Sequence, residues 1–198
     1  AITVRWYNAC ADYTITLSRG LRAIGHRVTV TAGPRTPAVA KAREYGLDVF
    51  APGNPATMNP LGFLRLAAAY RAYALENDVR AVNVHHGRDH LAWAAALRGT
   101  GIPIVRTSGD QIPPRTHPLA RYLFRFHTAG VVASCMTVRR FFAEGFGIDP
   151  ARIRVVNGGV DDVRFSPNQP RGTLRGEFGI PEDVFVFGII GRFSPVKG

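Results

Sequence analysis

Two kinds of segment alternate along most of the chain: short runs rich in β-branched and aromatic residues, and longer runs in which apolar residues recur every three or four positions. The short runs predict strands at residues 2–7, 27–32, 47–51, 81–85, 102–107, 130–134 and 152–156. The longer runs predict helices at 13–24, 37–45, 61–77, 88–98, 117–128 and 136–145. Alternation at this spacing predicts a Rossmann-like α/β domain, with a mostly parallel sheet and helices on both faces.

The pattern changes at residues 157–172, which are rich in Gly, Pro, Asn and Asp. A short helix is predicted at 173–178, and an apolar strand at 184–190 runs into Gly191. A strand that enters a glycine-containing loop is how a nucleotide-binding α/β unit begins. We therefore expect one domain over residues 1–170. Residues 171–198 would hold a linker and the first strand and loop of a second, truncated domain.

The predicted helix at 117–128 carries both apolar and basic faces. Four residues at helical spacing predict a buried face: Leu119, Tyr122, Leu123 and Phe126. Arg121 and Arg125 lie on another face, and Phe124 is expected to be exposed. The basic face is either an ordinary solvated surface or a contact with a phospholipid surface or a phosphorylated acceptor.

The formal net charge of the chain is +11, and 23 of its 25 basic residues are Arg. An arginine-rich genome composition would explain this charge. A surface for anionic partners would explain it too, and the candidates are nucleotide diphosphates, phosphorylated glycolipids and the anionic inner leaflet of a membrane. Nucleic acid is disfavoured, because no recognition motif or interleaving of aromatic and basic residues is present.

Other features of the sequence narrow the class of protein. No uninterrupted apolar run approaches the roughly 20 residues of a membrane-spanning helix, and no signal-peptide pattern opens the chain. Cys10 and Cys135 are too few and too far apart for a disulfide framework or a metal site. Cys135 is expected to be a small buried apolar residue rather than a nucleophile. A reducing cytoplasm is the expected location.

Residues 85–90 (HHGRDH) form the densest polar cluster and follow a predicted buried strand. Ligands of open α/β sheets bind at this carboxyl edge, and a helix N-terminus favours anions. We expect His85, His86, Arg88 and Asp89 to contact an acceptor. Asp89 could instead be a helix cap and Arg88 a solvated charge. Adjacent histidines point in different directions and no cysteine accompanies them, so a metal site is disfavoured.

The last eight residues, GRFSPVKG, form a glycine-containing basic loop. Gly191 lets the backbone approach a ligand, and Arg192 and Lys197 could converge on one anion such as a diphosphate. A solvated basic loop fits the same residues equally well.

Five segments in order are similar to those of family 4 glycosyltransferases of the GT-B type. Early segments are RAIGHRVTV, which resembles L-x-x-x-GH-x-V-x-V, and VNVHHGRD followed by LAWAAALRGTGIPIVRT, which resembles VH-x-H…GIPVV-x-T. Later segments are VVASCMTVRRFF, the crossover GVDDVRFSP, and GR-x-x-P-x-KG, the opening of the donor domain. The resemblance extends over nearly the whole chain and identifies the N-terminal half of a GT-B fold.

This resemblance implies a retaining transfer of a sugar from a nucleotide-diphosphate donor to an acceptor held by the N-terminal domain. It implies no metal, and no cofactor besides the nucleotide sugar that serves as donor substrate. Arg192 and Lys197 correspond to the family's diphosphate-binding pair, with Gly191 beside them. The glutamates of the family's donor motif would lie beyond Gly198, so this chain by itself is not expected to turn over.

The chain departs from the family pattern at three loops, one of which places Gly158 where the family commonly has Asn. The Gly-Gly loop after the first strand falls at Asn8 and Ala9, which weakens the case for amides that hold a donor phosphate there. Asn8 is expected to contact the acceptor. The family's histidine after GIPVV-x-T falls at Gly109, and Asp110 adjoins it. Asp110 and His85 are our candidates for catalytic groups.

The GRD and IVRTSGD segments and the basic helix resemble members that act on lipopolysaccharide-core or other envelope glycolipids. A glycolipid acceptor implies peripheral contact with an anionic membrane at its cytoplasmic face. Two alternatives stay open. One is a non-catalytic Rossmann-like module that binds a phosphorylated sugar or a partner, and the other is a nucleotide-sugar 2-epimerase, whose catalytic acids are not matched here.

Overall fold

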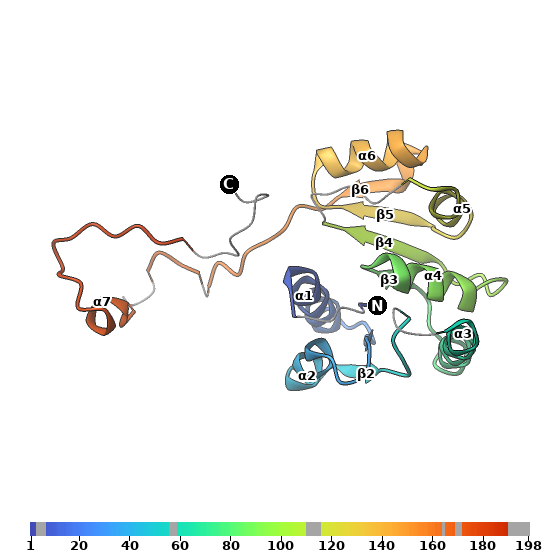
Figure 1. Ribbon diagram of the computed structural model, residues 1–198, viewed down its shortest axis with the longest axis horizontal. Helices are drawn as coiled ribbons and strands as arrows, with labels where there is room; N and C mark the ends of the chain where they lie inside the picture. Colours follow the sequence, from blue (N-terminus) through green and yellow to red (C-terminus); the bar gives the residue numbers. More distant parts are fainter. Residues whose placement is uncertain (3–6, 56–58, 110–115, 164, 169–171, 190–198) are drawn as a thin grey trace. The chain divides into compact units, whose positions relative to one another are not determined.

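The computed structural model describes residues 1–2, 7–55, 59–109, 116–163, 165–168 and 172–189 (Figure 1). The chain divides into two units, Ala1–Gly158 and Gly159–Gly198, and each is described by itself below. The expected domain boundary near residue 170 falls inside the second unit and stays a prediction.

The helices and strands of the first unit follow the predicted order closely. The helices are α1 (Ala9–Ala23), α2 (Pro37–Glu44), α3 (Pro60–Glu76), α4 (Gly87–Ala96), α5 (Pro118–Phe126), α6 (Met136–Phe146) and the 3-10 turn η1 (Pro150–Arg152). The strands are β1 (Thr29–Thr31), β2 (Asp48–Phe50), β3 (Val82–Val84), β4 (Ile104–Ser108), β5 (Gly130–Ala133) and β6 (Ile153–Val155). The strand expected at 2–7 falls largely on residues 3–6, outside the described ranges.

All described strand pairs are parallel. β1 pairs with β2, and β3, β4, β5 and β6 form a sheet in that order (Figure 1). The first two residues connect both sheets: the Ile2 N–H donates to the Thr31 carbonyl (2.8 Å), and the His85 N–H donates to the Ala1 carbonyl (3.1 Å). The predicted α/β class with a parallel sheet is confirmed.

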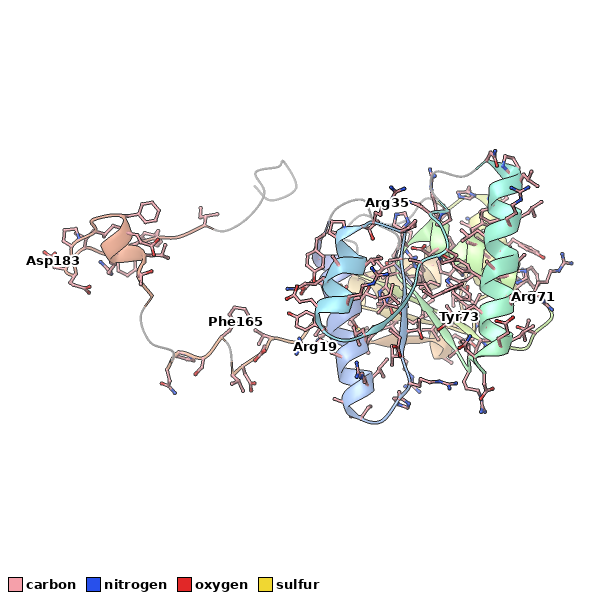
Figure 2. All side chains as sticks on the ribbon, turned by 90° about the horizontal axis from the view of Figure 1, so that it is seen from below. Arg19, Arg35, Arg71, Tyr73, Phe165 and Asp183 are labelled. Carbon is pink, nitrogen blue, oxygen red and sulfur yellow. The ribbon has the colours of Figure 1, made fainter. Side chains whose placement is uncertain are left out.

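Helices cover both faces of the β1–β2 pair. Val30 packs with residues of α1 and α2, whereas the neighbouring Thr29 accepts a hydrogen bond from the Tyr73 hydroxyl of α3 (2.9 Å). Successive side chains of a strand point to opposite faces, so α3 lies across the sheet from α1 and α2. Figure 2 shows Tyr73 on the inner side of α3, where its ring stacks on Phe50 with centroids 4.0 Å apart.

α4 is packed on several sides at once. It contacts α3, α5, β3 and β4, and most of its length is buried. The Trp93 ring stacks on Tyr70 of α3, with centroids 4.3 Å apart and planes 3° apart. Ala92, Ala94 and Ala96 are buried with Trp93. Small side chains let the backbones of packed helices approach closely, so α4 joins α3 to the sheet.

The orientation predicted for the helix at 117–128 is confirmed for Leu123 and wrong for Leu119, Tyr122, Phe126 and Phe124. Leu123 and Phe124 are its buried residues, whereas Leu119, Tyr122 and Phe126 are exposed. The Phe124 ring packs against Phe142 and Phe146 of α6 and the edge of His90. Because α5 contacts both α4 and α6, two consecutive side chains enter the core, and the regular apolar stripe is turned toward solvent.

The described part of the second unit contains one short helix, α7 (Leu174–Glu177), close to the predicted one. Residues 184–189 form no strand, which corrects the expectation of a strand at 184–190. Phe185, Phe187 and Ile189 are exposed. A strand needs a neighbour to accept and donate its ladder hydrogen bonds, and no β-ladder within the described part of the chain includes these residues.

Candidate functional site

The carboxyl edge of β3, β4 and β5 brings the predicted His85 close to the ends of two neighbouring strands. His85 directly follows β3, Gly109 follows β4 and Ser134 follows β5. The helices α4 and α6 begin immediately after this edge. Their N-termini carry partial positive charge and unpaired amides, so the edge is suited to bind a polar or anionic ligand.

Asn8 is the N-cap of α1. Its side-chain oxygen accepts a hydrogen bond from the Ala11 N–H (3.0 Å), and its backbone is extended, as a cap requires. This cap explains why α1 begins at Ala9, before the predicted start. The side chain is exposed, so its amide nitrogen remains the part of Asn8 that can reach an acceptor.

His85 lies at the carboxyl end of β3 and is 4% exposed. Its ring meets the edge of Tyr13 of α1, with centroids 5.8 Å apart. Burial lowers the pKa of His85 to about 2, and the positive charge of Arg106 acts in the same direction. The ring is therefore neutral near pH 7, where it can accept or donate a hydrogen bond but is a poor acceptor of a proton.

The first turn of α4 separates the predicted cluster into exposed and buried residues. His86 is the N-cap, with no side-chain capping bond, and both His86 and Arg88 are exposed. Asp89 is completely buried, since it lies on the inner face of the helix. A direct contact between Asp89 and an acceptor would require the carboxylate to be uncovered, so this role stays a prediction, whereas His86 and Arg88 are accessible.

Two buried polar groups behind this edge, at His90 and Ser108, were given no individual role from the sequence. The His90 Nε2 lies 2.9 Å from the Thr128 hydroxyl, which itself donates to the Leu123 carbonyl (2.9 Å). His90 is buried, and burial lowers its pKa to about 3. The Ser108 hydroxyl is also buried and has no hydrogen-bond partner among the described residues. The sequence signal for Ser108 was the polar end of β4, where Thr107 and Ser108 follow the apolar start of the strand.

Cys135 is exposed as the N-cap of α6, which corrects the expectation of a buried residue. The backbone N–H of Val138, in the first turn of α6, lowers the pKa of its thiol. The position at a helix start explains the exposure, because the cap residue lies outside the packed face of the helix.

Four predicted site residues lie outside the described ranges: Asp110, Gly191, Arg192 and Lys197. Within those ranges, no group of three or more His, Cys, Asp or Glu side chains is placed to hold a metal ion. In the same part of the chain, no helix is long and apolar enough to cross a membrane.

The sequence profile of Glycosyltransferase Family 4 matches residues 11–164. Curated relatives include D-inositol 3-phosphate glycosyltransferases. The protein of Kineococcus radiotolerans is 37% identical over 67 residues, which cover 34% of this chain and 15% of the relative. The protein of Salinispora arenicola is 26% identical over 125 residues, which cover 54% of this chain and 28% of the relative.

Two solved structures share the fold at low sequence identity. A glycosyltransferase from Rickettsia africae has a TM-score of 0.77 and 16% identity, and the match covers 92% of this chain and 49% of that one. The Anabaena protein Alr3699/HepE, in complex with UDP and glucose, has a TM-score of 0.68 and 16% identity, with 90% and 49% covered. The chain thus spans about half the length of these structures.

Proposed function

The chain belongs to glycosyltransferase family 4, and from this premise we propose that it forms the acceptor-side half of an enzyme that moves a sugar from a nucleotide-diphosphate sugar to an acceptor. The observation that carries the proposal is the exposed first turn of α4, with His86 and Arg88 at the carboxyl edge of the sheet. This turn lies within the residues that match the family.

His86 and Arg88 are proposed to hold the acceptor. A guanidinium offers paired donors to phosphate or to sugar hydroxyls, and the N-terminus of α4 favours the same negative charge. Asn8, at the start of α1, is the third proposed contact. Each of these side chains is exposed.

The donor is proposed to be bound by Arg192 and Lys197, beside Gly191. In this reaction the bond between the anomeric carbon and the diphosphate oxygen breaks, and negative charge develops on the leaving diphosphate. Positive groups held close to that oxygen stabilise the charge. The retained anomeric configuration is part of the same proposal, and the nucleotide sugar is supported by the solved relative that holds UDP and glucose.

We propose different roles for His85 and Asp110 toward the acceptor hydroxyl that attacks the sugar. Because burial lowers the pKa of His85 to about 2, its neutral ring is suited to orient a hydroxyl by a hydrogen bond rather than to take its proton. We assign the proton-accepting role to Asp110, whose carboxylate is the remaining candidate from the sequence.

A lipopolysaccharide-core or other envelope glycolipid is our proposed acceptor, reached from the cytoplasmic face of a membrane. A second candidate is a small phosphorylated polyol, favoured by the curated relatives that are D-inositol 3-phosphate glycosyltransferases. Both acceptors can carry phosphate, and both suit an arginine at a helix N-terminus.

The test is a transfer assay with the intact protein, UDP- and GDP-sugars, and either glycolipid extracts or inositol phosphate as acceptor. We expect a glycosylated product with the anomeric configuration of the donor, identified by mass spectrometry and NMR. Epimerised donor without transfer would assign the protein to the 2-epimerase alternative. Binding of nucleotide sugar with no reaction across the donor and acceptor panel would favour the non-catalytic module.

Substitutions separate the two halves of the proposed site. Arg192→Ala and Lys197→Ala should each lower kcat by about 10²–10³-fold, the usual effect of removing one group that stabilises developing charge. Arg88→Ala should raise the KM for the acceptor on the order of tenfold, with little change in kcat. Arg43→Ala, on the exposed surface of α2, is the control. Unchanged kinetics in all three test variants would contradict the site.

A further inference from the structure

The helix α5 presents to solvent an apolar stripe that its neighbours leave uncovered. Leu119, Tyr122 and Phe126 are 49%, 47% and 63% exposed. Their spacing places them on one side of a nine-residue helix. The Tyr122 and Phe126 rings contact each other, with centroids 5.1 Å apart. The stripe is separate from Leu123 and Phe124, which hold the helix to the core.

Positive side chains lie directly beside this stripe. Arg121 and Arg125 are exposed and four residues apart, so they share the adjoining side of α5. The Arg125 guanidinium lies 5.4 Å from the centre of the Phe126 ring. Residues 116–128, all described, include no Asp or Glu. An apolar stripe beside unopposed arginines is typical of helices that lie in the plane of a membrane interface.

We propose that the α5 surface, made of Leu119, Tyr122, Phe126, Arg121 and Arg125, docks the protein on an anionic lipid bilayer. Apolar side chains enter the boundary between headgroups and acyl chains, and the arginines contact lipid phosphates. The net charge of +11 favours the anionic surface over a second copy of this chain, since a symmetric dimer through α5 would bring arginines together. The inference extends the proposed glycolipid acceptor, because that acceptor lies in a membrane.

The experiment measures binding of the intact protein to phosphatidylcholine vesicles with and without phosphatidylserine, by co-sedimentation. The first test variant is Arg121→Gln/Arg125→Gln, and the second is Leu119→Ser/Phe126→Ser. The matched control is Ile24→Ser/Arg43→Gln, which removes an exposed apolar group at the C-cap of α1 and an exposed basic group from α2. Circular dichroism checks that each variant is folded.

We expect wild type to bind the anionic vesicles and to bind less as salt is raised. Loss of two arginines should weaken this binding about 30-fold, at roughly fivefold for each charge near the surface. Loss of Leu119 and Phe126 should weaken it by about tenfold or more. The control should bind like wild type.

Three results would overturn the proposal: wild type that does not bind anionic vesicles, test variants that bind as well as wild type, or test variants that lose only self-association in sedimentation velocity runs. The last would assign the surface to a second copy. Vesicle binding uses no donor or acceptor sugar. The protein can therefore fail to bind vesicles and still transfer a sugar to a soluble acceptor, or bind vesicles and transfer none. The two proposals are thus tested independently.

Discussion

Acidification should destabilise this fold through its buried histidines. The His90 ring is packed between α4 and α5, beside Thr128 and Phe124. Burial lowers its pKa from 6.5 to about 3. Well above pH 6.5 the ring is neutral in the folded and unfolded states, so it contributes no pH dependence. Below pH 6.5 only the unfolded chain binds the proton, and stability falls until the pH reaches the folded pKa.

The expected loss follows from the two pKa values. At pH 5 the unfolded ring lies about 1.5 units below its pKa, and each unit corresponds to about 1.36 kcal/mol. His90 therefore destabilises the fold by about 2 kcal/mol between pH 7 and pH 5. His85, whose pKa burial lowers to about 2, should add about as much. Together they remove about 4 kcal/mol, a large part of the stability of an ordinary domain.

Urea unfolding followed by circular dichroism at pH 7 and pH 5 measures this loss. In His90→Gln, which cannot titrate, the loss between the two pH values should shrink by about 2 kcal/mol. Thr128→Val keeps the buried ring but removes its hydrogen-bond partner, so its pH dependence should match wild type. An equal pH dependence in His90→Gln and wild type would refute the reasoning.

Three further predictions concern single positions in the first unit. Gly147 ends α6 with φ +65°, so Gly147→Ala should lower the free energy of unfolding by about 1 kcal/mol. Gly20 lies inside α1 with open space around it, so Gly20→Ala should raise the free energy of unfolding by about 0.5–1 kcal/mol. Urea titrations that show both substitutions changing this free energy in the same direction would contradict the prediction. Iodoacetamide should modify Cys135, with its lowered pKa, before the half-buried Cys10. Peptide mass spectrometry would show the reverse order if the reasoning is wrong.

The order of elements in the first unit was predictable because the buried face of each helix or strand requires a local, periodic pattern of apolar residues. Short β-branched runs and helical apolar spacing identified β1, β4 and α3 directly. The rotation of α5 was not predictable in this way. Its stripe of Leu119, Tyr122 and Phe126 satisfies the helical period, but packing of Phe124 among the α6 phenylalanines decides which side is buried.

The strand expected at 184–190 shows a second limit. Apolar, β-branched composition indicates which residues suit a strand, but pairing decides whether they form one. No ladder in the described part of the chain includes residues 184–189. A sheet is a long-range structure, and a local pattern carries no information on its partner.

The candidate site was predictable at the level of the segment and less so for single residues. A polar cluster after a buried strand placed residues 85–90 at the carboxyl edge of the sheet. The helix that begins at Gly87 then separates neighbouring side chains, so that Arg88 is exposed and Asp89 is buried. That separation depends on which face of α4 meets α3 and the sheet, which a single sequence does not specify.

The packing of α4 also determines where its sequence can vary over evolution. Most substitutions at Ala92, Ala94 or Ala96 would add volume where helices and strands are already in contact, and overpacked cores lose stability. His86 and Arg88 border solvent at the same helix's first turn. One helix thus combines a segment where larger side chains would cost stability with an exposed turn where side chains can be exchanged at little thermodynamic cost.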